Sequence, residues 1–133
     1  MSEARYDLLF GGHCQVPEPR AGGAGMVEAS VGADAFLRLL DHWAGLPADS
    51  RPRLRGLTVS RAQGSGRMLE LLLDTGGGRP FVLLTADWAR GRPAPGVSGV
   101  WPYAQWWEEE LSAFENLEFS GGDGDAGVAW RRN

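Results

Sequence analysis

The sequence contains no lysine, because all thirteen basic residues of this 133-residue chain are arginine. This absence excludes a Walker-type phosphate-binding lysine, a Schiff-base lysine and a lysine general base. A single cysteine, Cys14, cannot form an internal disulfide, and with only His13 and His42 beside it the chain is short of ligands for a zinc or iron–sulfur site. We therefore expect a protein without a metal or cofactor of its own.

Long hydrophobic runs are also missing. The longest apolar stretches, around Leu71–Leu73 and Phe81–Leu84, fall well below the ~20 residues of a membrane-spanning helix. Residues 1–7 lack the basic-then-apolar order of a secretory leader. Seventeen acidic residues give a net charge of −4, which argues against nucleic acid as a partner. These features predict a soluble, cytoplasmic protein that does not insert directly into the membrane.

The length fits one domain, in which about two-thirds of the unfolded surface would be buried on folding. Twenty glycines and eight prolines predict an unusually large share of loops. Residues 26–121 hold the periodic segments and are expected to form the core of this single domain. Residues 1–25 are expected to be a loosely structured N-terminal segment, and residues 122–133 a flexible tail.

Hydrophobic periodicity predicts two helices, at residues 33–44 and 104–114. In the first helix, four apolar residues recur at i, i+3, i+4 and i+7: Phe36, Leu39, Leu40 and Trp43. In the second helix, three apolar residues share one face at i, i+4 and i+7: Trp107, Leu111 and Phe114. The second helix is therefore rich in aromatic residues and lies near the C-terminus.

Alternating or continuous apolar runs predict short strands. They lie at residues 6–10, 26–31, 53–61, 68–74, 80–85 and 117–119. Glycine-rich turns at 63–66 and 75–78 indicate consecutive antiparallel hairpins, and the continuous run Leu71–Leu73 suggests a central strand covered on both faces. The predicted fold is α+β, with a helix on a small antiparallel or mixed sheet of about four strands.

Candidate catalytic groups are few. The carboxylates of Glu108, Glu109 and Glu110 point about 100° apart on a helix, so a solvated face or an ionic contact to a partner is favoured over acid–base or metal chemistry. His13 and Cys14 are neighbours in an extended segment and point to opposite faces. The Gly76–Gly78 run stands between two strands rather than before a helix, so it indicates a turn and not a phosphate cradle.

Two other patterns have competing interpretations. Arg51, Arg53 and Arg55 are spaced by two and would share one strand face, where they either bind an acidic partner or phosphates, or protect an edge strand from aggregation. The pair Asp123 and Asp125 resembles the start of a calcium loop, but the later ligands are missing, so a flexible linker is favoured.

Tryptophan is the strongest compositional anomaly, with six residues in 133. Trp101, Trp106 and Trp107 cluster with Tyr103 within seven positions. A core of this size does not easily hide all of these rings, and exposed tryptophan and tyrosine near arginine are typical of a protein-binding surface. The composition thus points to recognition rather than catalysis.

The segment from Trp101 to Gly121 resembles a signature of the 30 kDa subunit of respiratory complex I and of the equivalent subunit of membrane-bound nickel–iron hydrogenases. The matching positions are Trp101, Pro102, Ala104, Trp106, Glu108, Glu110, Leu111, Phe114, Phe119 and Gly121. Glu109 replaces the family's arginine, and Glu115-Asn116 replaces its aromatic–glycine pair. With the upstream order of elements, the resemblance extends over about residues 26–121 and implies a short, divergent member.

The resemblance implies a structural subunit with no activity of its own in an NADH dehydrogenase-like or hydrogenase-like electron-transfer complex. Its partners would be the hydrogenase-like large subunit and the small iron–sulfur subunit, on the inner face of the cell membrane. The residues expected to bind these partners are Trp101, Pro102, Tyr103, Trp106, Trp107, Glu108 and Glu110. A stand-alone scaffold or assembly adaptor is the alternative, and a small enzyme would instead require a pocket with converging polar groups.

Overall fold

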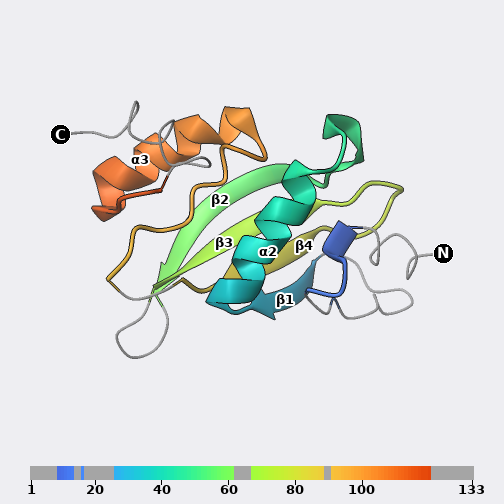
Figure 1. Cartoon of the computed structure of the whole chain (residues 1–133), viewed down its shortest axis with the longest axis horizontal. Coiled ribbons are helices and arrows are strands. Elements are labelled where there is room, and N and C mark those ends of the chain that lie inside the picture. Colours follow the sequence, from blue (N-terminus) through green and yellow to red (C-terminus); the bar gives the residue numbers. More distant parts are fainter. Residues whose placement is uncertain (1–8, 14–15, 17–25, 62–66, 89–90, 121–133) are drawn as a thin grey trace.

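The computed structural model describes residues 9–13, 16, 26–61, 67–88 and 91–120, so the predicted tail at 122–133 lies outside the described residues. The elements in chain order are β1 (Val27–Val31), α2 (Ala33–Ala44), η1 (Ala48–Ser50), β2 (Arg53–Arg61), β3 (Arg67–Asp74), β4 (Val82–Ala86), η2 (Pro102–Ala104) and α3 (Gln105–Glu115). They form one mixed sheet with α2 packed on it and α3 beside it (Figure 1). The predicted α+β class is confirmed, and the helical bounds agree with the sequence to within a residue or two.

The four strands lie in the order β1-β4-β3-β2. β2 pairs with β3 and β3 with β4 in antiparallel fashion, as the two glycine-rich turns predict. In the second turn Gly76, Gly77 and Gly78 all have positive φ, and the Gly76 N–H donates to Asp74 Oδ1 at 2.9 Å. β1 pairs in parallel with β4, which makes the sheet mixed and leaves β1 and β2 as its edges.

α2 covers one face of the sheet. Its four predicted apolar residues are all buried, and the helix ends at Ala44, where the Gly45 N–H donates to the Asp41 and His42 carbonyls. Leu71 and Leu73 of β3 point into the same core. Leu72 alternates to the opposite face and is half-buried, so the prediction that both faces of β3 are covered is wrong for the described part of the chain.

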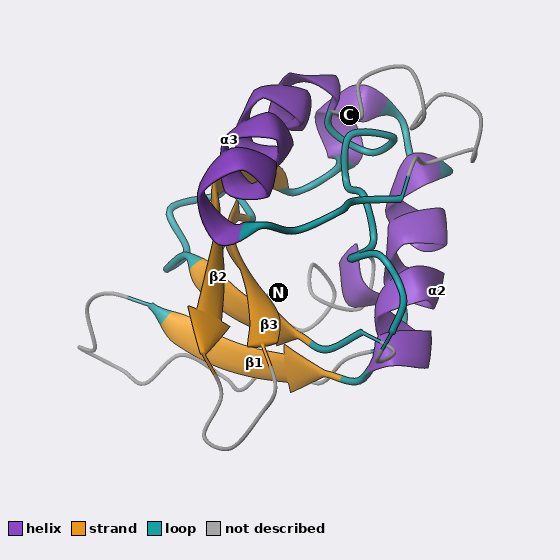
Figure 2. Cartoon of the chain, turned by 90° about the vertical axis from the view of Figure 1, so that its left-hand side faces the viewer, coloured by secondary structure: helices purple, strands orange, loops and turns teal. Residues whose placement is uncertain are grey.

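α3 lies beside the edge strand β2, away from β1 (Figure 2). The connection from β4 to η2 runs between the two helices, and Ala94 in it forms a parallel bridge with Phe119. The predicted strand 117–119 is therefore only an isolated bridge. Leu9 and Phe10, predicted as part of a strand, are helical and buried, and the Trp43 indole N–H donates to the Leu9 carbonyl.

Candidate functional site

The segment that carries the tryptophan cluster begins with a buried anchor. The Trp101 indole N–H donates to the Pro52 carbonyl at 2.8 Å, and its ring centroid lies 5.4 Å from that of Trp43. Only 4% of Trp101 is exposed. Trp101 is therefore chiefly a core residue, and the expectation that it binds a partner stays a prediction.

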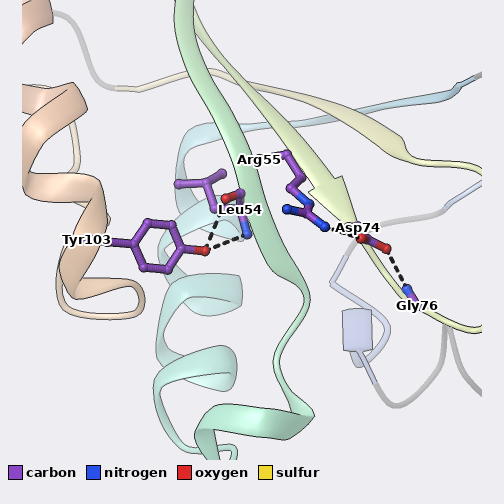
Figure 3. A network of polar contacts seen from close by, with 5 residues as sticks. All are labelled: Leu54, Arg55, Asp74, Gly76 and Tyr103. Carbon is purple, nitrogen blue, oxygen red and sulfur yellow. Dashed lines mark hydrogen bonds and ion pairs between the residues drawn. The ribbon is translucent and has the colours of Figure 1, made fainter.

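Tyr103 joins η2 to the free edge of β2. Its hydroxyl accepts a hydrogen bond from the Leu54 N–H and donates one to the Leu54 carbonyl, both at 3.0 Å (Figure 3). One side chain thus satisfies both backbone groups of an edge-strand residue, which otherwise offer a template for another strand. The ring itself remains half exposed and lies 6.0 Å, centroid to centroid, from Trp107.

The exposed face of α3 carries aromatic rings. Trp106 is 60% exposed and Phe114 is 79% exposed, and the exposed Glu110 lies between them at i+4 from each. The periodicity predicted that Phe114 shares one face with Trp107 and Leu111, and this prediction is wrong, because Phe114 is exposed. We call Tyr103, Trp106, Glu110 and Phe114, with the exposed Pro102 beside them, the α3 face.

Glu108 takes the place on the inward side of α3 that an apolar residue would normally fill. Its carboxylate is completely buried, and its Oε2 accepts a hydrogen bond from the Val97 N–H, whereas Oε1 has no hydrogen-bond partner of normal geometry. The expectation that Glu108 lies on a solvated face is therefore wrong, whereas its contact to a partner stays a prediction. Glu110 is exposed and Glu109 is half-buried, so the three carboxylates do not converge.

Burial raises the pKa of Glu108 from 4.5 to about 7, against the lowering effect of hydrogen bonds from Val97 and Ser98. A carboxyl group with such a pKa can exchange a proton near neutral pH. The hydrogen bonds that act on its carboxylate come from Val97 and Ser98, and neither residue is titratable near neutral pH. The arrangement therefore ties α3 to the preceding connection rather than forming an acid–base pair.

The same connection is held from a second side. The Ala94 N–H donates to the Glu118 carbonyl and the Ser120 N–H to the Ala94 carbonyl, both at 2.8 Å. Between them, a Cβ atom added at Gly96 would lie 2.0 Å from the Ser120 carbonyl oxygen. Only glycine fits at this close approach of two backbones. The sequence indicated only a loop in this segment. Its high glycine and proline content is the feature that could have indicated the close packing.

Arg51 has a structural role, whereas the sequence analysis placed it in a surface stripe. It precedes β2, and its guanidinium donates hydrogen bonds to the carbonyls of Ala44, Leu46 and Val100. It does not share a strand face with Arg53 and Arg55, so the predicted stripe of three arginines is corrected to two. Both remaining arginines are exposed on the edge strand β2.

An open groove with a volume of about 580 Å³ lies between the start of β2 and the start of α3. Two arginines, Arg53 and Arg55, add positive charge to it. Its apolar lining comes from six residues: Ala48, Pro52, Leu54, Trp101, Tyr103 and Trp107. The Tyr103 hydroxyl and the Trp101 indole N–H already have backbone partners. The groove therefore offers aromatic faces and cations, not the convergent polar groups expected of an active site.

The other candidates do not assemble into a reactive site. His13 and His42, far apart in sequence, have ring centroids 6.0 Å apart, whereas Cys14, Asp123 and Asp125 lie outside the described residues. Among the residues described, no three side chains of His, Cys, Asp or Glu are grouped to hold a metal ion. None of the described helices combines the length and apolar character required to cross a bilayer.

No family model matches this chain, and no curated protein matches its sequence. Among solved structures, the fold resembles a chain of the membrane-bound sulfane sulfur reductase, an archaeal respiratory membrane complex. The TM-score is 0.66 at 17% sequence identity, and the match covers 90% of this chain and 70% of the other. At this identity the likeness concerns the fold: this chain has the same architecture as one chain of that complex.

Proposed function

We propose that this protein is a non-catalytic structural subunit of a complex-I-like or hydrogenase-like respiratory complex. In this role it docks on the hydrogenase-like large subunit and the small iron–sulfur subunit at the inner face of the membrane. The observation that carries the proposal is the exposed aromatic surface of the α3 face, on the very segment that resembles the 30 kDa subunit of complex I. The shared fold with a chain of an archaeal respiratory membrane complex supports it.

The exposure of these rings favours a protein partner. Trp106 and Phe114 are among the largest apolar side chains, and leaving each in water forgoes about 1.5–3 kcal/mol of burial free energy. Aromatic side chains of this kind are the ones that dominate binding energy at protein interfaces. Glu110 between them supplies a charge that an interface can pair at its rim.

One departure from the family pattern, asparagine in place of glycine at position 116, leaves the backbone conformation unchanged. Asn116, which stands where the family has glycine, ends α3 in the left-handed conformation with φ of 56°. Glycine is the usual residue for this conformation and asparagine is the next most common choice. The backbone turn that the family's glycine would make is therefore retained here.

The test is co-purification of the full chain, affinity-tagged and expressed in its own organism, from membranes solubilised in mild detergent. The wild-type chain should recover a hydrogenase-like large subunit and a small iron–sulfur subunit, identified by mass spectrometry. Trp106→Ser with Phe114→Ser should lose most of both. Leu37→Ser is the matched control, because Leu37 is 50% exposed on α2, and it should recover both partners.

Recovery of the wild-type chain as a monomer or dimer without these subunits would overturn the proposal and favour the stand-alone scaffold or adaptor. Equal recovery of both partners by the double variant would remove the α3 face from the interface. Circular dichroism of each variant shows that the fold is retained, which is expected because both substituted side chains are exposed.

A further inference from the structure

We propose that the groove between β2 and α3 binds an acidic polypeptide segment of a partner subunit, with an apolar side chain inserted against Trp107 and Tyr103 and a carboxylate paired with Arg53. This inference rests on the proposed function and adds the chemistry of the segment that is recognised. The groove shares Tyr103 with the α3 face, so one partner surface would cover both.

The charge of the groove is opposite to that of the whole chain. Arg53 and Arg55 line it, and no acidic residue of the described part of the chain does. The chain as a whole carries a net charge of −4. Arg55 makes a single contact of 3.3 Å with Asp74, at an exposed pair of the kind that contributes about 0–1 kcal/mol (Figure 3). Arg53 is exposed and forms no ion pair within the described residues. A positive groove in an acidic protein favours an acidic segment of its partner.

The walls favour a polypeptide side chain over a small metabolite. Small-molecule sites fix their ligands with a few precisely placed polar groups. Here the Trp101 indole N–H is bonded to the Pro52 carbonyl, and the Tyr103 hydroxyl is bonded to both backbone groups of Leu54. The groove surface left for a ligand to contact therefore consists of aromatic rings and two arginines. Such a surface can bind a partner segment in which an apolar side chain is flanked by carboxylates.

The absence of lysine from the sequence allows a sharp test. Arg53→Lys keeps the positive charge and introduces the one side-chain amine of the protein. A carbodiimide, which joins an amine directly to a carboxylate in contact with it, is applied to the purified complex. In the complex we expect a cross-link from position 53 to an Asp or Glu of a partner subunit. The isolated variant can form only a link within the chain, for example to Asp74, which lies opposite position 53 on β3. Arg38→Lys on α2, also exposed, is the control and should give no link to that partner segment.

A second arm measures the contribution of the charge. Arg53→Glu should reduce recovery of the partner by about tenfold or more, since like charges then face each other, whereas Arg38→Glu should not. An intact complex in which Arg53→Lys gives no cross-link, or in which Arg53→Glu recovers the partner in full, overturns the groove proposal while leaving the proposed function in place. Failure of the wild-type chain to recover any such complex overturns both.

Discussion

The carboxylate of Glu108 lies in the protein interior, where its Oε2 accepts a hydrogen bond from the backbone N–H of Val97. This bond links α3 to the glycine- and proline-rich connection that precedes it. The same connection touches the Phe119 segment through Ala94 and supplies the Val100 carbonyl to Arg51. Glu108 thus stabilises the position of α3, and with it the orientation of the α3 face.

The ionisation of Glu108 gives a pH dependence of known sign. Its pKa is raised from 4.5 to about 7 in the folded state, so between these pH values the folded protein binds the proton more tightly than the unfolded chain. The contribution of this group to the free energy of unfolding is therefore largest at low pH and is lost as pH rises through 7. The uncharged variant Glu108→Gln does not lose this contribution. The free energy of unfolding of the variant minus that of wild type should therefore increase by about 2–3 kcal/mol when the pH is raised from 5 to 8.

Urea unfolding of wild type and Glu108→Gln at several pH values measures this difference. The contributions of the other titrating groups are common to both proteins and largely cancel in the subtraction. Glu110→Gln is the control, because Glu110 is exposed on the same helix, and its difference from wild type should stay flat. Parallel pH profiles for wild type and Glu108→Gln would show that the carboxyl group titrates normally.

Tyr103→Phe should destabilise the protein by about 1–3 kcal/mol, because it leaves both backbone groups of Leu54 without their partner. It should also increase concentration-dependent association, measured by analytical ultracentrifugation, because part of the β2 edge becomes free. Thr58→Val removes another hydroxyl on β2, one that is exposed and bonded only to Glu70, and serves as the control. Equal stability of Tyr103→Phe and wild type would contradict the capping role.

Gly96→Ala should cost about 2–4 kcal/mol, because the added methyl group would collide with the Ser120 carbonyl and force two backbone segments apart. Gly56→Ala is the matched change in β2, where the new methyl group would meet only Leu72 at 3.8 Å. Its effect should stay within about 1 kcal/mol. Thermal unfolding of both variants makes the comparison, and a tolerated Gly96→Ala would disprove the close approach.

Trp107→Ala and Trp106→Ala, although neighbours in sequence, should differ in their effect on folding. Trp107 packs against the core and the Tyr103 ring, so its truncation should cost about 2–4 kcal/mol. Trp106 is mostly exposed, and its truncation should cost less than about 1 kcal/mol. Urea unfolding at pH 7 distinguishes the two, and similar losses would mean that α3 is rotated from its described position.

Local sequence determined most of the secondary structure. The apolar spacing of residues 33–44 set both the extent of α2 and its buried side, since a helix of that pattern has a single face to bury. The glycine-rich turn at 76–78 fixed an antiparallel neighbour for β3, because a short connection allows no other pairing. The concentration of aromatic residues near the C-terminus likewise marked the candidate site.

Tertiary structure alone decided which sides of the later elements face inward. The pattern of α3 placed Phe114 with Trp107, yet Phe114 is exposed. Glu108 is inside instead, where it accepts a hydrogen bond from the buried Val97 N–H of the preceding connection. The parallel pairing of β1 with β4 and the hydrogen bond from Arg51 to the Val100 carbonyl also join segments far apart in the chain. Periodicity reports only neighbours along the chain, so contacts of this kind leave no signal in it.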